Sequence, residues 1–175
     1  MAAWRKMDVA PDPPPIFLDT SYINALINTR DQWHPVAVEW ERHLALSRRK
    51  LLTTEFILVE IADGLAAVRF RTQAVRVIET LQASSQVEIV PASSYLFSAA
   101  LDLYCRHADK AWGLTDCASF AVMSEGSLSE ALTADEHFRQ AGFRALLLDR
   151  IPGGQRPNGN EPTVAARPAA SLLAR

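Results

Sequence analysis

The chain has few cysteines, no long apolar run and no excess of positive charge. Its two cysteines, Cys105 and Cys117, form neither a CxxC pair nor a disulfide framework, and both fall in apolar helical patterns. We therefore expect both to be buried free thiols. No apolar segment is long enough to span a bilayer, and the first residues lack the hydrophobic centre of a signal peptide. These absences favour a cytoplasmic protein without a membrane anchor.

The net charge of −2 argues against indiscriminate binding to nucleic acid, because proteins with that activity ordinarily present a strongly basic surface. A role on RNA would need a local basic patch or a bound metal ion. Arg69 and Arg76 are seven residues apart and share one face of an expected helix, so they are the candidates for such a patch. An ordinary amphipathic helix is the alternative explanation for both.

Short apolar runs alternate with helical patterns along the middle of the chain. Runs of the first kind occur at 16–18, 51–53, 87–90, 131–134 and 145–148. This alternation predicts an α/β fold in which a parallel sheet of about five short strands is covered by helices on both faces. We expect Leu46 to face inward in a helix at about 33–49, and Val59 and Val75 to belong to the apolar patterns of the two helices that follow.

The ends of the chain differ in composition from its middle. We expect residues 1–15 to be a flexible Pro-rich leader and residues 150–175, rich in Pro, Gly, Ala and Asn, to be a disordered tail. Residues 16–149 then form a single folded domain, which is long enough to bury a core of its own.

Four acidic residues fall where such a sheet usually binds ligands. Asp19 and Asp135 each follow a short apolar run, and parallel strands bring their carboxyl ends to one edge of the sheet. Asp116 lies in the first turn of a helix that we expect Thr115 to cap, and Glu60 lies within the helix that begins near residue 55. Each acid also has an ordinary explanation, as a helix cap, a first-turn acid or an exposed helix residue.

Four carboxylates brought together in partial burial would repel one another, which raises their pKa values unless a cation lies between them. Oxygen ligands of this kind suit Mg²⁺ or Mn²⁺, which bind through a few carboxylates and keep several waters. Such a site is suited to hydrolysing phosphodiesters, since one metal activates a water molecule and a second stabilises the leaving oxygen.

Other interpretations of the same residues are weaker. Asp19-Thr20-Ser21 is similar to an aspartic protease signature, but no second copy occurs and the layout is not all-β. A phosphatase of the Asp-x-Asp type is disfavoured because Ser21 stands where the second aspartate is needed. The four histidines show no metal-ligand spacing. We expect surface or groove positions for them, with His137 near enough to Asp135 to contact a substrate.

Four blocks of the sequence resemble the PIN domain family, and most closely its VapC-like toxin ribonucleases of bacterial toxin–antitoxin pairs. The blocks are Phe17-Leu18-Asp19-Thr20-Ser21, the helix with Glu60, Leu114-Thr115-Asp116-Cys117-Ala118-Ser119-Phe120, and Leu132-Thr133-Ala134-Asp135 with His137-Phe138 and Gly142-Phe143. The resemblance covers residues 16–149 and implies a three-layer α/β/α sandwich. It also implies Mg²⁺- or Mn²⁺-dependent cleavage of RNA.

By resemblance, Asp19, Glu60, Asp116 and Asp135 are the catalytic and metal-binding residues. Ser21 is expected to support the first acid, and Thr115 is a weaker candidate for a similar role. The family further implies a homodimer and a small antitoxin protein that occupies the active-site groove. A catalytically silent PIN-like module that binds RNA or protein is the alternative, and the complete set of four acids argues against it.

Overall fold

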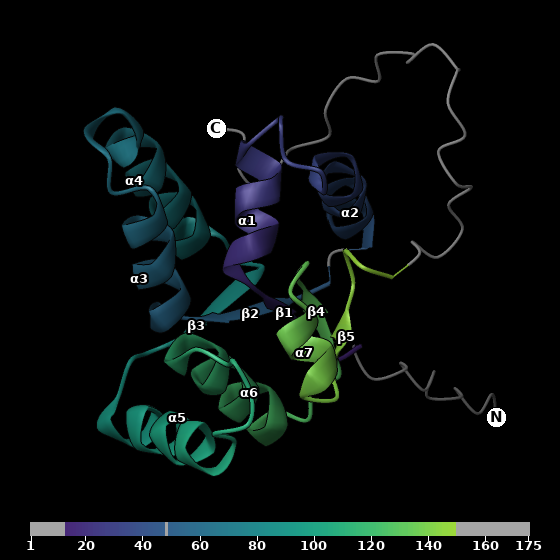
Figure 1. The fold of residues 1–175 in the computed structure, drawn as a ribbon. Helices are drawn as coiled ribbons and strands as arrows, with labels where there is room; N and C mark the ends of the chain where they lie inside the picture. Colours follow the sequence, from purple (N-terminus) through teal and green to yellow (C-terminus); the bar gives the residue numbers. More distant parts are fainter. Residues whose placement is uncertain (1–12, 48, 150–175) are drawn as a thin grey trace, which may run out of the picture.

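The computed structural model describes residues 13–47 and 49–149, so most of the expected leader and all of the expected tail lie outside the described residues. The described chain forms five strands and seven helices (Figure 1). The strands are β1 (Ile16–Leu18), β2 (Leu51–Thr54), β3 (Val87–Val90), β4 (Glu130–Leu132) and β5 (Arg144–Ala145). The helices are α1 (Thr20–Ile27), α2 (His34–Ser47), α3 (Glu55–Gly64), α4 (Val68–Ala83), α5 (Ser94–Arg106), α6 (Leu114–Glu125) and α7 (Glu136–Gln140).

The five strands form one parallel sheet in the order β3-β2-β1-β4-β5. The first strand lies at its centre, where Ile16 pairs with Leu51 of β2 and Leu18 pairs with Leu132 of β4. Because every pair is parallel, the carboxyl ends of all five strands lie along one edge. The predicted α/β fold with a parallel sheet of this size is confirmed.

Helices cover both faces of the sheet, which gives three layers (Figure 1). Helices α1 to α4 lie on one side, and α5 and α6 lie on the other, with α7 packed beside α6. This double covering explains why Ile16, Phe17 and Leu18 of β1 are all fully buried, as a central parallel strand requires. Within the described ranges, no helix has both the length and the apolar character needed to cross a membrane.

Aromatic packing fixes α7 against α6 and the sheet. Phe120 of α6 meets Phe138 of α7 edge-on with ring centroids 5.1 Å apart, and Phe138 lies 6.0 Å from Phe17 of β1. The indole Nε1 of Trp112, just before α6, donates a hydrogen bond to Gln140 Oε1 at 3.1 Å. Buried aromatic pairs of this geometry stabilise a fold beyond the area they bury. The first turns of α6 and α7 are therefore held in a fixed relation.

Leu46 was predicted to face inward and is exposed, so that prediction was wrong. Val59 and Val75, from the apolar patterns of α3 and α4, are exposed as well. Leu46, Val59 and Val75 are 83%, 58% and 48% exposed. Leu46 falls in the last turn of α2, and α3 is apolar at so many positions that its sequence does not single out one face. The buried face of α4 is instead formed by Ala74, Val77 and Leu81.

Three further details differ from expectation. Cys117 is buried as predicted, whereas Cys105 is exposed on the outer face of α5. Gly113, not Thr115, is the N-cap of α6, and its backbone N–H is bound by the side chain of Asp116. The last strand is shorter than the apolar run at 145–148 suggests, because the chain turns after Ala145.

Candidate active site at the carboxyl ends of the central strands

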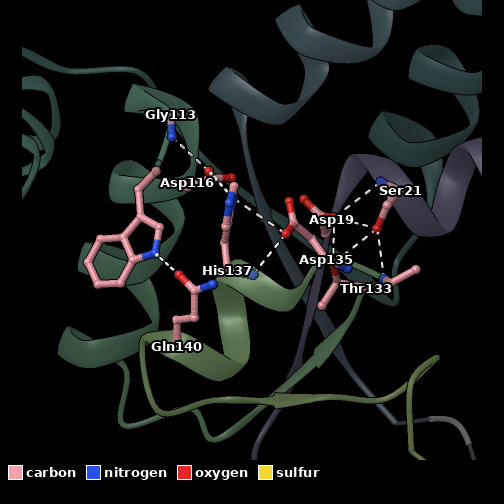
Figure 2. Close-up of polar contacts among 10 residues, drawn as sticks. Asp19, Ser21, Gly113, Asp116, Thr133, Asp135, His137 and Gln140 are labelled. Carbon is pink, nitrogen blue, oxygen red and sulfur yellow. Dashed lines mark hydrogen bonds and ion pairs between the residues drawn. The ribbon is translucent and has the colours of Figure 1, made fainter. Parts of the chain in front are cut away.

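Asp19 follows the central strand directly and is 6% exposed. Its Oδ2 accepts hydrogen bonds from the backbone N–H of Ser21 (3.1 Å), the Ser21 hydroxyl (2.6 Å) and the Thr133 hydroxyl (2.8 Å) (Figure 2). Within the described part of the chain, Oδ1 accepts no hydrogen bond, and it is not enclosed. One carboxylate oxygen therefore fixes the side chain while the other is available to a ligand.

Thr133 joins the ends of β1 and β4. Besides donating to Asp19, its hydroxyl oxygen accepts a hydrogen bond from the backbone N–H of Asp135 at 3.0 Å. The Ser21 hydroxyl oxygen accepts from the N–H of Ala134 at 3.0 Å. These crossed hydrogen bonds hold the two aspartates that follow neighbouring strands in one arrangement.

Asp116 reaches the site from the opposite layer, at the start of α6. Its Oδ2 accepts from the backbone N–H of Gly113 at 2.8 Å, which satisfies the N–H of the N-cap residue at the start of the helix. The same oxygen accepts from His137 Nδ1 at 3.1 Å. Asp116 is thus bound both to its own helix and to α7.

Asp135 and His137 belong to the short helix α7. Asp135 caps that helix, with Oδ1 accepting from the N–H of His137 at 2.8 Å, and His137 Nδ1 lies 3.4 Å from the same oxygen. One ligand atom from each of Asp116, Asp135 and His137 lies within 4.8 Å of the others. Three residues from two helices therefore offer donor atoms close enough to share one cation.

Glu60 comes from α3 and is exposed at the rim of the site. Its Oε2 accepts from the Thr20 hydroxyl at 3.0 Å, which ties α3 to the residue following Asp19. The charges of Asp19, Asp116 and Asp135 all act on this carboxylate. Asp19, Asp116 and Asp135 therefore lie together, as Figure 2 shows, and the hydrogen bond with Thr20 places Glu60 beside the residue that follows Asp19.

Burial and mutual repulsion disfavour the ionised forms of the carboxylates in the site. Desolvation raises the pKa of Asp19, Glu60 and Asp116 above their ordinary values. Hydrogen bonds from Ser21, Thr20 and Gly113 act in the opposite direction, while neighbouring carboxylates raise the pKa further. Across the described ranges, no arginine or lysine pairs with any of the four acids. A cation bound among them would remove the repulsion.

The supporting residues predicted from the sequence fall in different places. Ser21 contacts Asp19 as expected. Thr115 lies in the first turn of α6, where its carbonyl oxygen accepts from Ser119 Oγ at 3.0 Å. Its hydroxyl makes no hydrogen bond to a carboxylate among the described residues.

Arg69 and Arg76 are exposed on α4, where the Arg69 guanidinium stacks over the Phe70 ring at 4.7 Å. Their part in substrate binding stays a prediction.

Sequence reasoning missed Thr133, Thr20 and the contribution of His137. The signal for Thr133 was its place immediately after β4, on a strand next to β1, where the hydroxyl can reach the end of the neighbouring strand. The signal for His137 was the Asp135-x-His137 spacing at a helix start, which turns both side chains toward one side. The contacts of Thr133 with Asp19 and of His137 with Asp116 could not be recognised before the order of the strands was known.

Fold and site together define a three-layer α/β/α domain with a carboxylate cluster at the carboxyl ends of its two central strands. A model of the PIN domain family matches residues 16–144. The chain therefore belongs to the PIN domain family.

Two comparisons give relatives of known name. The 23S rRNA-specific endonuclease VapC20 of Mycobacterium tuberculosis, from strains CDC 1551 and H37Rv, is 29% identical over 128 residues. That alignment covers 73% of this chain and 95% of VapC20. The crystal structure of Mycobacterium tuberculosis VapC20, a Sarcin-Ricin loop cleaving toxin, superposes with a TM-score of 0.64 at 28% identity. It covers the same shares of the two chains, 73% and 95%.

Proposed function

We propose that the protein is a divalent-metal-dependent endoribonuclease that hydrolyses RNA phosphodiester bonds as the toxin of a toxin–antitoxin pair. The observation that carries the proposal is that Asp19, Asp116 and Asp135 lie together while Glu60 is held beside them by Thr20, with the four acids contributed by separate elements. The likeness to VapC20, an endonuclease and toxin by name, supports the same conclusion.

The donor set fits a small, hard divalent cation. Asp116, Asp135 and Asp19 Oδ1 would hold Mg²⁺ or Mn²⁺, and Glu60 would bind it or orient water at the rim. His137 Nδ1 would join them as a ligand only after giving up the proton it shares with Asp116, and imidazole is tolerated better by Mn²⁺ than by Mg²⁺. When bound, such a cation lowers the pKa of a water molecule that it holds and stabilises the negative charge that develops on the leaving oxygen.

The chain's own residues position these groups. Ser21 and Thr133 fix one oxygen of Asp19 so that the other faces the site. The hydrogen bond from the N–H of Gly113 holds Asp116, and the hydroxyl of Thr20 restrains Glu60. Because these hydrogen bonds exist before substrate binds, the carboxylates need little reorganisation during hydrolysis.

A toxin role implies two protein partners. A small antitoxin would cover the acidic groove, and a second copy of the chain would complete a homodimer. RNA containing the sarcin–ricin loop of 23S rRNA is the first substrate to test, because that is the target named for VapC20.

The direct test is cleavage of such an RNA fragment by the purified full chain with Mg²⁺ or Mn²⁺. We expect cleavage that stops on adding EDTA and is lost in Asp19→Asn. Asp102→Asn is the matched control, since Asp102 is an exposed acid on α5 paired with Arg106. Cleavage that continues with EDTA and in Asp19→Asn would refute the metal mechanism.

A further inference from the structure

An open pocket of about 330 Å³ lies between the starts of α3 and α5. It is lined by Phe56, Ala92, Ser93, Ser94, Phe97 and Ser98. Its volume is at the lower end of the range of small-ligand sites, about 300–1,000 Å³. None of the proposed catalytic residues lines it, so it is a separate feature of the surface.

The pocket lies on the same edge of the sheet as the acids. Helix α3 begins directly after β2, and Ser93 caps α5 three residues after the end of β3. Glu55 Oε2 accepts from the N–H of Ala92 at 2.7 Å, which holds the β3–α5 connection against the start of α3. In the strand order β3-β2-β1-β4, the pocket lies beyond the ends of the first two strands, and Asp19 and Asp135 follow the next two.

Helix α3 connects the two sites. Phe56 and Glu60 are four residues apart, so they lie one turn from each other on the same side of the helix. Helix α3 therefore offers a path from Glu60 to the pocket for an RNA strand whose phosphate lies among the acids.

The lining chemistry suits a nucleobase better than a phosphate. Its six side chains carry no charge, so none of them can form an ion pair with a phosphate. Phe97 is 44% exposed although it is wholly apolar, and an exposed aromatic face is what base stacking uses. The hydroxyls of Ser94 and Ser98 can donate to or accept from the edge of a base.

We propose that this pocket binds one nucleobase of the RNA, next to the phosphodiester bond that is cleaved, with Phe97 as the stacking platform. This inference rests on the proposed function for the identity of the polymer. A base held there fixes the register of the RNA, and the pocket is thereby a determinant of which bond is cut.

The test measures binding of a short single-stranded RNA of mixed sequence to the full chain carrying Asp19→Asn, so that no cleavage occurs. Phe97→Ala should weaken binding about 10-fold, the effect of losing one stacked base. Phe97→Trp, which keeps an aromatic face, should retain it. Tyr104→Ala on the same helix is the control, because Tyr104 is exposed to a similar extent, 48% against 44%, and lies outside the pocket.

A series of RNAs, each with an abasic nucleotide at a different position, identifies the base that occupies the pocket. One abasic position should weaken binding to the parent protein about 10-fold and should cause no further loss in Phe97→Ala, since both changes remove the same contact. Unchanged RNA binding in Phe97→Ala overturns the proposal, as does an equal loss in Tyr104→Ala. The latter result would mean that RNA binding depends on the exposed face of α5 as a whole and not on the pocket.

Rejection of the base-binding pocket can be distinguished from rejection of the proposed metal-dependent cleavage. Loss of binding in Phe97→Ala combined with metal-independent cleavage would keep the pocket and reject the metal mechanism. Metal-dependent cleavage combined with unchanged binding in Phe97→Ala would keep the mechanism and reject the pocket.

Discussion

Asp19 serves the fold and the site with different oxygens. Its Oδ2 caps α1 and accepts from Ser21 and Thr133, whereas Oδ1 remains available. The capping role and the ligand role, which were alternatives in the sequence, are therefore compatible. The cost is a carboxylate that burial makes harder to ionise.

That cost predicts an unusual dependence of stability on pH. The pKa of Asp19 is raised in the folded state above its ordinary value of 3.8, so the folded state binds the proton more tightly than the unfolded state. Its contribution to stability is present at low pH and is lost as pH rises from about 4 through the raised pKa. In EDTA, the melting temperature of the parent protein should fall relative to that of Asp19→Asn over this window.

Mn²⁺ should reverse this loss, because the cation binds the ionised carboxylates and stabilises only the folded state. Thermal melting across the pH range, with EDTA or with Mn²⁺, measures both effects. If the difference in melting temperature between the parent protein and Asp19→Asn does not change with pH, the pKa of Asp19 is not raised in the folded state and the account is contradicted.

Thr133 orients Asp19 without itself binding the metal in our proposal. Thr133→Val keeps the side-chain volume but removes the hydroxyl that donates to Asp19 and accepts from Asp135. We expect Mn²⁺ affinity to fall about 10- to 100-fold, the usual effect of losing a residue that orients a ligand. Thr133→Ser keeps the hydroxyl and should lose much less; equal losses in the two variants would argue against the hydrogen bonds as the cause.

Helix α6 depends on Asp116 for its start. The side chain binds the N–H of Gly113, which would otherwise lack a partner within the helix. In EDTA, Asp116→Ala should be less stable to urea than Asp116→Asn by about 1 kcal/mol, because an amide oxygen can still accept that hydrogen bond. Both variants lack the negative charge, so their difference isolates the cap. Equal unfolding free energies would show that the cap contributes nothing.

The elements differ in how well the sequence predicted them. The runs ending in Asp19 and Asp135 were recognised because a buried strand followed by an acid and a helix is a strong local pattern. The inward face of α2 was less well predicted, since Leu46 faces solvent, and the apolar patterns of α3 and α4 include Val59 and Val75, which are exposed. Hydrophobic periodicity gives the presence of a helix more reliably than its orientation, which packing against the sheet decides.

The arrangement of the whole domain explains what remained hidden. Convergence of the acids followed from assuming a parallel sheet, and the strand order β3-β2-β1-β4-β5 agrees with that assumption. The contacts of Thr133 with Asp19 and of His137 with Asp116 join residues 114 and 21 positions apart. No local pattern encodes such contacts. The pocket between α3 and α5 is likewise a product of strand order.

The central claim is that the four acids form one divalent-cation site. Calorimetric titration of the full chain with Mn²⁺, in parallel with Asp19→Asn and Asp102→Asn, tests it most directly. The account predicts saturable Mn²⁺ binding by the parent and by Asp102→Asn, and binding that is lost or greatly weakened in Asp19→Asn. Equal Mn²⁺ binding by all three proteins, or none by the parent at millimolar concentration, would contradict it.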